Sequence, residues 1–171
     1  MKLNVCIGIS MILLAFGCTP KQKGLIYFND FESMKGWAPA YLNKEPHRSG
    51  QYSNKMDSVN IYGVTLRLPF KEVSDRKIKK VKVSFWALMI ETNSKSEIVV
   101  EVYAPDKTKL FYLAKDMNSF VSKPKKWTEI KLEYTFPGDE IVMPQNIISV
   151  YPYNESKKDI YIDDLKIEFV I

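Results

Sequence analysis

The sequence predicts an all-β fold, a two-sheet antiparallel β-sandwich or jelly roll, on three observations. From Leu25 onward, short alternating or apolar runs follow one another, and none keeps the helical period of about 3.6 residues. Turn-forming stretches such as Pro137-Gly138-Asp139 and Asn154-Glu155-Ser156 separate these runs. Several runs are rich in β-branched and aromatic residues. About nine such strands in one domain favour two packed sheets over one open sheet.

The alternation of side chains predicts which residues form the core. In chain order, the expected strands are Leu25–Phe31, Gln51–Met56, Gly63–Leu68, Lys79–Ile90, Glu97–Ala104, Leu110–Lys115, Thr128–Phe136, Ile147–Tyr153 and Asp159–Val170. Successive side chains of a strand point to opposite faces, so residues of one parity share a face. Every second residue is apolar or aromatic in 81–89, 98–102 and 130–136. We expect these residues to pack together between the sheets.

The opposite faces of these strands carry aromatic and acidic side chains that a core does not need. By parity these are Trp86, Glu101, Tyr103, Tyr151 and Tyr153. Flat aromatic faces stack on the C–H side of a pyranose ring, and polar neighbours bind its hydroxyls. We therefore predict these five as ligand-binding residues for a glycan. The alternatives are half-buried tyrosines with solvated hydroxyls and a tryptophan that only packs at a sheet edge.

Composition excludes several classes of protein. The 171 residues include one His and two Cys, which excludes His-rich zinc sites, zinc ribbons and disulfide frameworks. The 25 Lys and Arg exceed the 20 Asp and Glu by five. Without interleaved aromatics, this small excess does not predict nucleic-acid binding. We interpret His47, in a polar loop beside Arg48, as a surface residue rather than a catalytic base.

Residues 1–17 have the pattern of a cleaved export signal. Lys2 supplies the positive charge, and the apolar stretch from Val5 to Phe16 is too short to span a bilayer as a stable helix. The segment Leu14-Ala15-Phe16-Gly17-Cys18 resembles the lipobox of bacterial lipoproteins, although Ala15 stands where Leu is usual. The resemblance implies that Cys18 is acylated, as with palmitate, and becomes the first residue of the mature chain. An ordinary signal peptide or a short anchor helix is the alternative.

The segment after the signal predicts the location of the protein. Residues 18–24 would be the lipidated Cys and a polar tether, and residues 25–171 the single sandwich domain. No Asp directly follows Cys18, which by analogy with lipoprotein sorting favours the outer membrane. We expect a lipid-anchored outer-membrane protein that faces the periplasm or the cell surface, with the lipid membrane as one partner. Because Cys6 would leave with the signal, the mature chain would hold no free thiol for catalysis.

Two separated segments resemble carbohydrate-binding modules with the galactose-binding-like jelly-roll fold. The first is Asn29-Asp30-Phe31-Glu32 with Gly36-Trp37, followed by Ser49-Gly50-Gln51-Tyr52-Ser53. The second is Tyr161-Ile162-Asp163-Asp164-Leu165-Lys166-Ile167 near the C-terminus. The same chain order, with Lys126-Trp127-Thr128 before a late strand, is similar to small lipoproteins of polysaccharide-degrading Gram-negative bacteria. The resemblance implies a jelly roll whose partner is a glycan or polysaccharide.

The resembling modules often hold a structural calcium ion between the first strand, the Ser-Gly loop and the last strand. The resemblance implies metal ligands here at Asp30, Glu32, Ser49, Gln51 and Asp163. Calcium takes about six to eight oxygen ligands from carboxylates and carbonyls. By parity Asp163 shares a face with Leu165 and Ile167, so its carboxylate is expected at the rim of the core, where an unpaired charge is costly. A turn cap or an ion pair with Lys or Arg is the alternative for Asp163.

Three functions remain, in decreasing order of expectation. The first is a non-catalytic module that binds glycan through exposed aromatics or end loops. The second is a structural or interaction protein of the cell envelope, in which the same aromatic face docks a protein partner. The third is an enzyme: Glu101 with Asp116 or Glu129 could form a glycosidase pair, but no motif marks one. We therefore predict no enzymatic activity.

Overall fold

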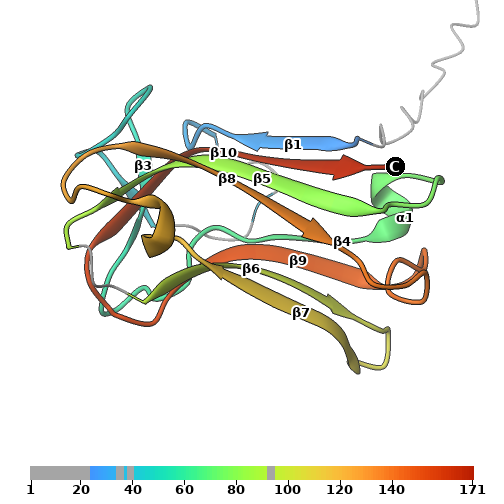
Figure 1. The fold of residues 1–171 in the computed structure, drawn as a ribbon. Coiled ribbons are helices and arrows are strands. Elements are labelled where there is room, and N and C mark those ends of the chain that lie inside the picture. Colours follow the sequence, from blue (N-terminus) through green and yellow to red (C-terminus); the bar gives the residue numbers. More distant parts are fainter. Residues whose placement is uncertain (1–23, 34–36, 38–40, 92–94) are drawn as a thin grey trace, which may run out of the picture.

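Two antiparallel β-sheets pack face to face in the computed structural model, which describes residues 24–33, 37, 41–91 and 95–171 (Figure 1). The six-stranded sheet has the order β2-β3-β10-β5-β8, with β1 also paired to β10, and the four-stranded sheet has the order β4-β9-β6-β7. The strands are β1 (Ile26–Asn29), β2 (Leu42–Asn43), β3 (Ser53–Met56), β4 (Leu66–Pro69), β5 (Lys80–Met89), β6 (Ser96–Tyr103), β7 (Lys109–Asp116), β8 (Thr128–Thr135), β9 (Ile147–Asn154) and β10 (Ile160–Val170). The predicted all-β sandwich is confirmed.

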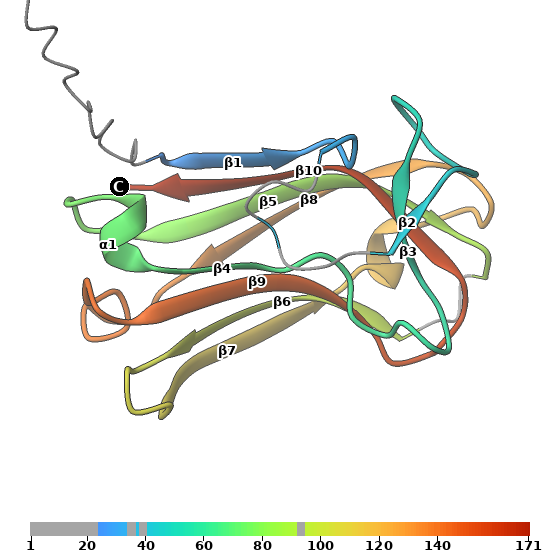
Figure 2. The same ribbon diagram turned by 180° about the vertical axis from the view of Figure 1, so that it is seen from behind.

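The core lies between the two layers, which Figure 2 shows from behind. The alternating apolar residues expected from parity in β5, β6 and β8 are buried there. Phe70 and Phe111 pack edge-on against Phe136, with ring centroids 5.7 and 5.3 Å away. The hydroxyl of buried Tyr134 in β8 donates a 2.8 Å hydrogen bond to the carbonyl of Ile98 in β6. This bond links the two sheets through the core.

The expected strands are present with shifted ends, and three further elements occur. Strand β2, the helix α1 (Phe70–Val73) and the 3-10 helix η1 (Asn118–Phe120) were not predicted. Each has two to four residues, which is too short for hydrophobic periodicity to reveal. Helix α1 begins after Pro69 and buries Phe70 and Val73, so it closes one end of the core.

A β-bulge in β10 overturns the expected orientation of Asp163. Asp163 lies opposite Trp86 of β5, whereas Lys166 lies opposite Ser84, so β10 contains one extra residue between these pairs. Asp164 takes the left-handed conformation there, with φ of 52°. The parity therefore changes within the bulge, and Asp163 shares the outer face of the sheet with Trp86 instead of lying at the rim of the core. It is nevertheless 0% exposed, and the backbone N–H groups of residues 48 and 49 contact its carboxylate.

Residues 1–23, including Cys18, lie outside the described residues, so the export signal, the lipidation and the domain limits stay predictions. In the described part of the chain, no helix has the length and hydropathy needed to cross a bilayer.

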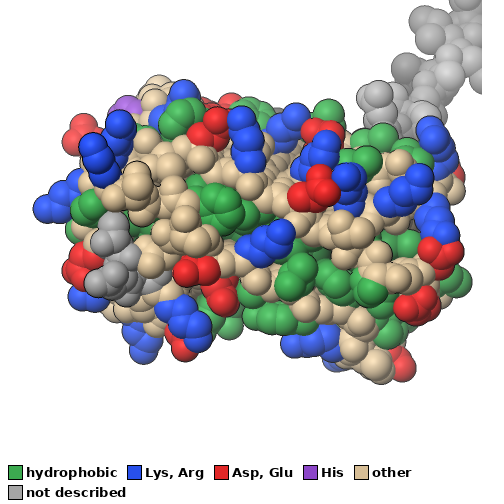
Figure 3. Space-filling view, viewed as in Figure 1, with side chains coloured by type: hydrophobic (Ala, Val, Ile, Leu, Met, Phe, Trp, Pro, Cys, Tyr) green, Lys and Arg blue, Asp and Glu red, His purple; other side chains and the backbone are tan. Residues whose placement is uncertain are grey.

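Charged side chains of both signs are interspersed on the side of the molecule shown in Figure 3. Several form ion pairs, such as Lys80 with Glu133 at 3.0 Å and Lys166 with Glu168 at 3.2 Å. These pairs lie on the outer face of the six-stranded sheet, so this face is a solvated surface with mixed charge.

Candidate functional site: a tyrosine-lined groove

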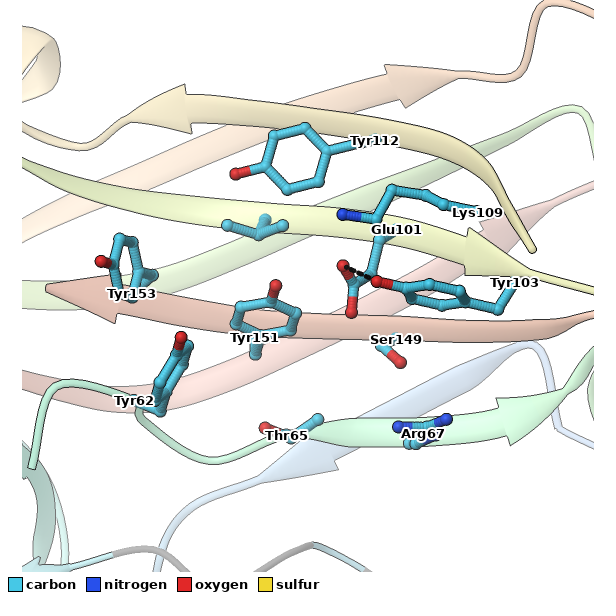
Figure 4. A pocket seen from close by; sticks show the side chains of 11 residues that line it. Tyr62, Thr65, Arg67, Glu101, Tyr103, Lys109, Tyr112, Ser149, Tyr151 and Tyr153 are labelled. Atoms are coloured by element: carbon cyan, nitrogen blue, oxygen red, sulfur yellow. Dashed lines mark hydrogen bonds between the residues drawn. The ribbon is translucent and has the colours of Figure 1, made fainter. Parts of the chain in front are cut away.

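An open groove with a volume of about 590 Å³ lies on the outer face of the four-stranded sheet (Figure 4). It is lined by Tyr62, Thr65, Arg67, Val99, Glu101, Tyr103, Lys109, Tyr112, Ser149, Tyr151 and Tyr153. Five of these residues are tyrosines, and Glu101 carries the one carboxylate in this lining. The volume falls within the range of about 300–1,000 Å³ that is typical of ligand sites.

The strand register brings four of these side chains into one row across the sheet. Arg67 of β4 lies opposite Ser149 of β9, which lies opposite Glu101 of β6. Glu101 in turn lies opposite Tyr112 of β7. Residues directly opposite each other in antiparallel strands share a face, with Cβ atoms about 4.5–5.5 Å apart. The row therefore runs across the groove from β4 to β7.

Three tyrosines form a wall at one end of the groove. The ring centroid of Tyr62 lies 5.1 Å from that of Tyr153 and 5.9 Å from that of Tyr151. The interplanar angles are 34° and 61°, so the rings are tilted and do not form one flat platform. Burial raises the pKa of the Tyr151 hydroxyl, and the negative charge of Glu101 adds to this effect. This hydroxyl is therefore neutral at physiological pH and can donate or accept a hydrogen bond.

The floor of the groove is polar. The Glu101 side chain is only 9% exposed, and its Oε2 accepts a 3.1 Å hydrogen bond from the hydroxyl of Tyr103. Ser149 is 2% exposed, and its buried Oγ has no hydrogen-bond partner within the described structure. A buried hydroxyl without a partner is costly, so a polar ligand group that pairs with it would be favoured.

Two cations border this floor. Lys109 Nζ lies 5.6 Å from the ring centroid of Tyr103 and 4.9 Å from that of Tyr112. The Tyr103 hydroxyl and the charge of Glu101 raise the pKa of Lys109, so the ammonium stays protonated. Arg67 is exposed at the β4 end of the row.

The structure brings four of the five predicted ligand-binding residues together and separates the fifth. Glu101, Tyr103, Tyr151 and Tyr153 all line the groove. Trp86 lies on the outer face of the six-stranded sheet, where the Arg48 guanidinium is 4.1 Å from its ring centroid. The expectation that Trp86 shares a face with the tyrosines is wrong. Parity within a strand does not tell which sheet the strand joins.

Sequence reasoning missed several residues of the groove. Arg67 lies between the buried Leu66 and Leu68, so the alternation along its strand predicts that its side chain points to the outer face. The same holds for Ser149 between Ile148 and Val150. Tyr62 gave no such signal, because it precedes β4 and joins the sheet only through an isolated bridge to Tyr153. The other missed lining residues are Thr65, Val99, Lys109 and Tyr112.

Four of the five predicted calcium ligands, all except Asp30, meet at the loop formed by residues 48–52, where backbone N–H groups bind the carboxylates of Asp163 and Glu32. Asp163 Oδ2 accepts hydrogen bonds from Arg48 N at 2.7 Å and Ser49 N at 3.2 Å, and its Oδ1 accepts one from Asp164 N at 2.9 Å. Glu32 Oε1 accepts bonds from Gln51 N at 2.7 Å and Tyr52 N at 2.9 Å. Asp30 Oδ1 accepts a 3.1 Å bond from Glu32 N.

This arrangement does not fit a calcium ion. Amide N–H groups already bind carboxylate oxygens of Asp163 and Glu32 that a cation would need. Within the described ranges, no group of three or more His, Cys, Asp or Glu side chains is placed to hold a metal. The calcium ion that the resemblance implies is thus not supported by this arrangement, and comparing stability with and without calcium tests it directly.

No protein-family model matches the chain, and no curated protein is detectably similar to it. Solved structures do match. The chain resembles the CBM22-1 xylan-binding domain of Paenibacillus barcinonensis Xyn10C, with a TM-score of 0.57, 17% identity, and coverage of 87% of this chain and 97% of that domain. It also resembles the C-terminal family 22 carbohydrate-binding module of Clostridium thermocellum Xyn10B, with a TM-score of 0.54, 18% identity, and coverage of 85% and 94%.

An enzyme domain shares the fold more distantly. The enzymatically active domain of bacteriophage CBA120 tailspike protein 4 matches with a TM-score of 0.53 and 8% identity, over 82% of this chain and 20% of the tailspike chain. At these identities the likeness shows the fold alone. The fold is an all-β jelly-roll sandwich, which those carbohydrate-binding modules share.

Proposed function

We propose that this chain is a non-catalytic carbohydrate-binding module that holds a glycan in the groove of its four-stranded sheet. The observation that carries the proposal is the set of five tyrosines facing one open groove above a polar floor. Tyr62 and Tyr112 are the most exposed of them, at 54% and 49%. Rings of this kind offer apolar faces to sugar C–H groups and hydroxyls to sugar oxygens.

The polar groups of the floor complement a sugar ring. Glu101 retains acceptor capacity beyond its bond to Tyr103, and the Ser149 hydroxyl is unpaired. A glycan presents many hydroxyls that both donate and accept hydrogen bonds. The solved structures with this fold include domains named as xylan-binding, which supports glycan as the ligand class.

The carboxylate count supports binding without catalysis. Hydrolysis of a glycosidic bond ordinarily needs two carboxyl groups, which lie about 5–9.5 Å apart on either side of the bond. Glu101 is the one carboxylate that lines the groove in the described structure. An assay for reducing ends after incubation with the bound glycan tests this part of the proposal.

We also propose that the module is lipid-anchored through Cys18 and faces the periplasm or the cell surface. The support is the lipobox-like segment that ends at Cys18 and the polar tether after it. Metabolic labelling with a palmitate analogue, lost in Cys18→Ser, tests the anchor. Unchanged labelling of the variant would contradict it.

A second candidate function, docking of an envelope protein, has one specific observation in its favour. Beyond Tyr62 a smaller cavity includes Tyr41 and Val59, and Val59 is 83% exposed. Exposed apolar groups of this kind occur at protein interfaces. They lie beside the groove, so the two functions are separable by mutation.

The test is a glycan screen of the whole chain in mild detergent, followed by calorimetric titration of the glycan that binds. Tyr151→Ala is expected to weaken binding at least about fivefold, as loss of a central aromatic contact does. Trp86→Ala is the matched control, because Trp86 lies on the other sheet. Loss of binding in Trp86→Ala alone would move the site to that sheet. A folded chain that binds no glycan, but that binds an envelope protein through the surface around Val59, would favour protein docking.

A further inference from the structure

We propose that the Arg67 end of the groove recognises an anionic group on the glycan, either the carboxylate of a uronic acid or a sulfate ester. This inference rests on the proposed function and names the class of glycan. The structural basis is a cationic end of the groove beside a buried, unpaired hydroxyl.

The groove continues past Tyr103 into a second cavity of about 300 Å³. This cavity shares Arg67, Glu101 and Tyr103 with the groove and adds Lys107 from the hairpin between β6 and β7. A sugar chain lying along the tyrosines can therefore extend into a region with a different charge.

The charge at this end is positive. Arg67, Lys107 and Lys109 line the two cavities, against the single carboxylate of Glu101, which already accepts a hydrogen bond from Tyr103. In the described structure neither Arg67 nor Lys107 has an ion-pair or hydrogen-bonded side-chain partner. The nearby Asp106 lines neither cavity, and its Oδ1 accepts a 2.9 Å hydrogen bond from Thr108 N.

Ser149 supplies an independent indication of a ligand. It lies directly opposite Arg67 in the sheet, it is 2% exposed, and its Oγ is buried without a partner. An anion at this point can accept hydrogen bonds from both the guanidinium and the hydroxyl. Such charge-assisted bonds are about twice as strong as those between neutral groups, and the planar fork of Arg matches a carboxylate.

Glu101 limits where the anion can lie. It flanks Ser149 on the side away from Arg67, so it repels an acidic group placed toward β6 and Tyr112 and accepts sugar hydroxyls instead. The groove thus favours a glycan with its charge at the Arg67 end and a neutral ring between Tyr103 and Tyr151.

The experiment is an array that pairs acidic oligosaccharides with their neutral counterparts, probed with the whole chain in mild detergent. The uronate arm holds glucuronoxylan, pectin and alginate fragments with carboxyl-reduced versions. The sulfate arm holds chondroitin sulfate fragments with desulfated versions. Binding is measured at an ionic strength of about 0.15 M, where exposed charges are largely screened beyond about 8 Å. The arm that binds identifies the anion.

We expect at least one acidic member to bind roughly tenfold more tightly than its neutral counterpart, and Arg67→Ala to remove that preference. Arg67→Lys is expected to keep part of it, since the charge remains and the fork is lost. Arg76→Ala is the control, because Arg76 is exposed and lines neither cavity. Circular dichroism checks that each variant folds.

Three outcomes would overturn the inference, and they separate it from the proposed function. If acidic and neutral members bind equally and Tyr151→Ala abolishes this binding, the proposed glycan-binding function stands and the anionic specificity is wrong. If the chain prefers every polyanion, and Arg76→Ala weakens this preference as much as Arg67→Ala does, the preference comes from the general surface charge. No binding by any pair would remove the inference together with the proposed function.

Discussion

The backbone N–H of Gly63 donates a 3.0 Å hydrogen bond to the carbonyl of Pro152, and the two residues touch at the edge of β9. A Cβ added at Gly63 would lie 2.4 Å from Pro152 Cγ and 2.7 Å from Asn54 Oδ1. Asn54 Oδ1 is itself fixed by a 2.9 Å bond from Val64 N. Because Tyr62 precedes Gly63 and bridges to Tyr153, this close approach holds one wall of the groove in place.

Gly63→Ala is therefore expected to destabilise the protein and to weaken glycan binding. Overpacking against a rigid proline ring costs about 1–3 kcal/mol and must displace the chain at Tyr62. Urea denaturation and calorimetric titration measure the two effects. Gly24→Ala is the control, since the nearest atom to its added Cβ, Ile26 O, lies 3.6 Å away. Unchanged stability in Gly63→Ala would contradict the close contact.

Tyr134→Phe tests the hydrogen bond between the sheets. Removing the hydroxyl leaves the buried carbonyl of Ile98 without this donor, and we expect a loss of about 1–3 kcal/mol in the free energy of unfolding. Tyr161→Phe is the comparison, because its hydroxyl makes a long 3.4 Å contact with the half-exposed Asp159. Equal losses of unfolding free energy for the two substitutions in urea denaturation would show that the Tyr134 hydrogen bond does not stabilise the protein more than the Tyr161 contact does.

Alternation within strands was enough to predict the sandwich and its core. The apolar parity of β5, β6 and β8 corresponds to buried residues such as Val83, Val100 and Leu132. The same alternation located Glu101, Tyr103, Tyr151 and Tyr153 on an outer face. These are local properties, because the direction of a side chain in a regular strand depends only on its position.

The errors arise where non-local structure decides. Trp86 has the expected outward parity, but its strand joins the other sheet, and topology is set by pairing between distant segments. Asp163 is turned outward by the bulge at Asp164, and one inserted residue reverses the parity of everything before it. Tyr62 enters the groove through a bridge outside any regular strand. None of these features has a local hydrophobic pattern.

The hydrogen bonds around Asp163 and Glu32 predict that calcium does not stabilise the fold. A cation would have to displace amide N–H donors from both carboxylates, leaving those N–H groups unpaired. We expect equal melting temperatures in millimolar calcium and in chelator, measured by differential scanning calorimetry. A melting temperature that falls in chelator and returns with calcium would support the resemblance-based prediction and require this loop to rearrange.

The burial of Asp163 also predicts how stability depends on pH. Loss of solvation raises the pKa of this carboxyl above its ordinary 3.8, and this effect outweighs the bonds from Arg48 N, Ser49 N and Asp164 N. The folded state then binds the proton more tightly than the unfolded state. Its contribution to stability is thus fully present below pH 3.8 and is lost as the pH rises through the raised pKa.

The reference for this dependence is Asp163→Asn, which cannot titrate. Relative to that variant, the wild-type protein is expected to lose free energy of unfolding as the pH rises from 3.8 toward neutrality. Urea denaturation of both proteins at a series of pH values gives the difference directly. A relative gain in wild-type stability over the same range would mean that the three amide bonds dominate and hold the pKa of Asp163 below its ordinary value.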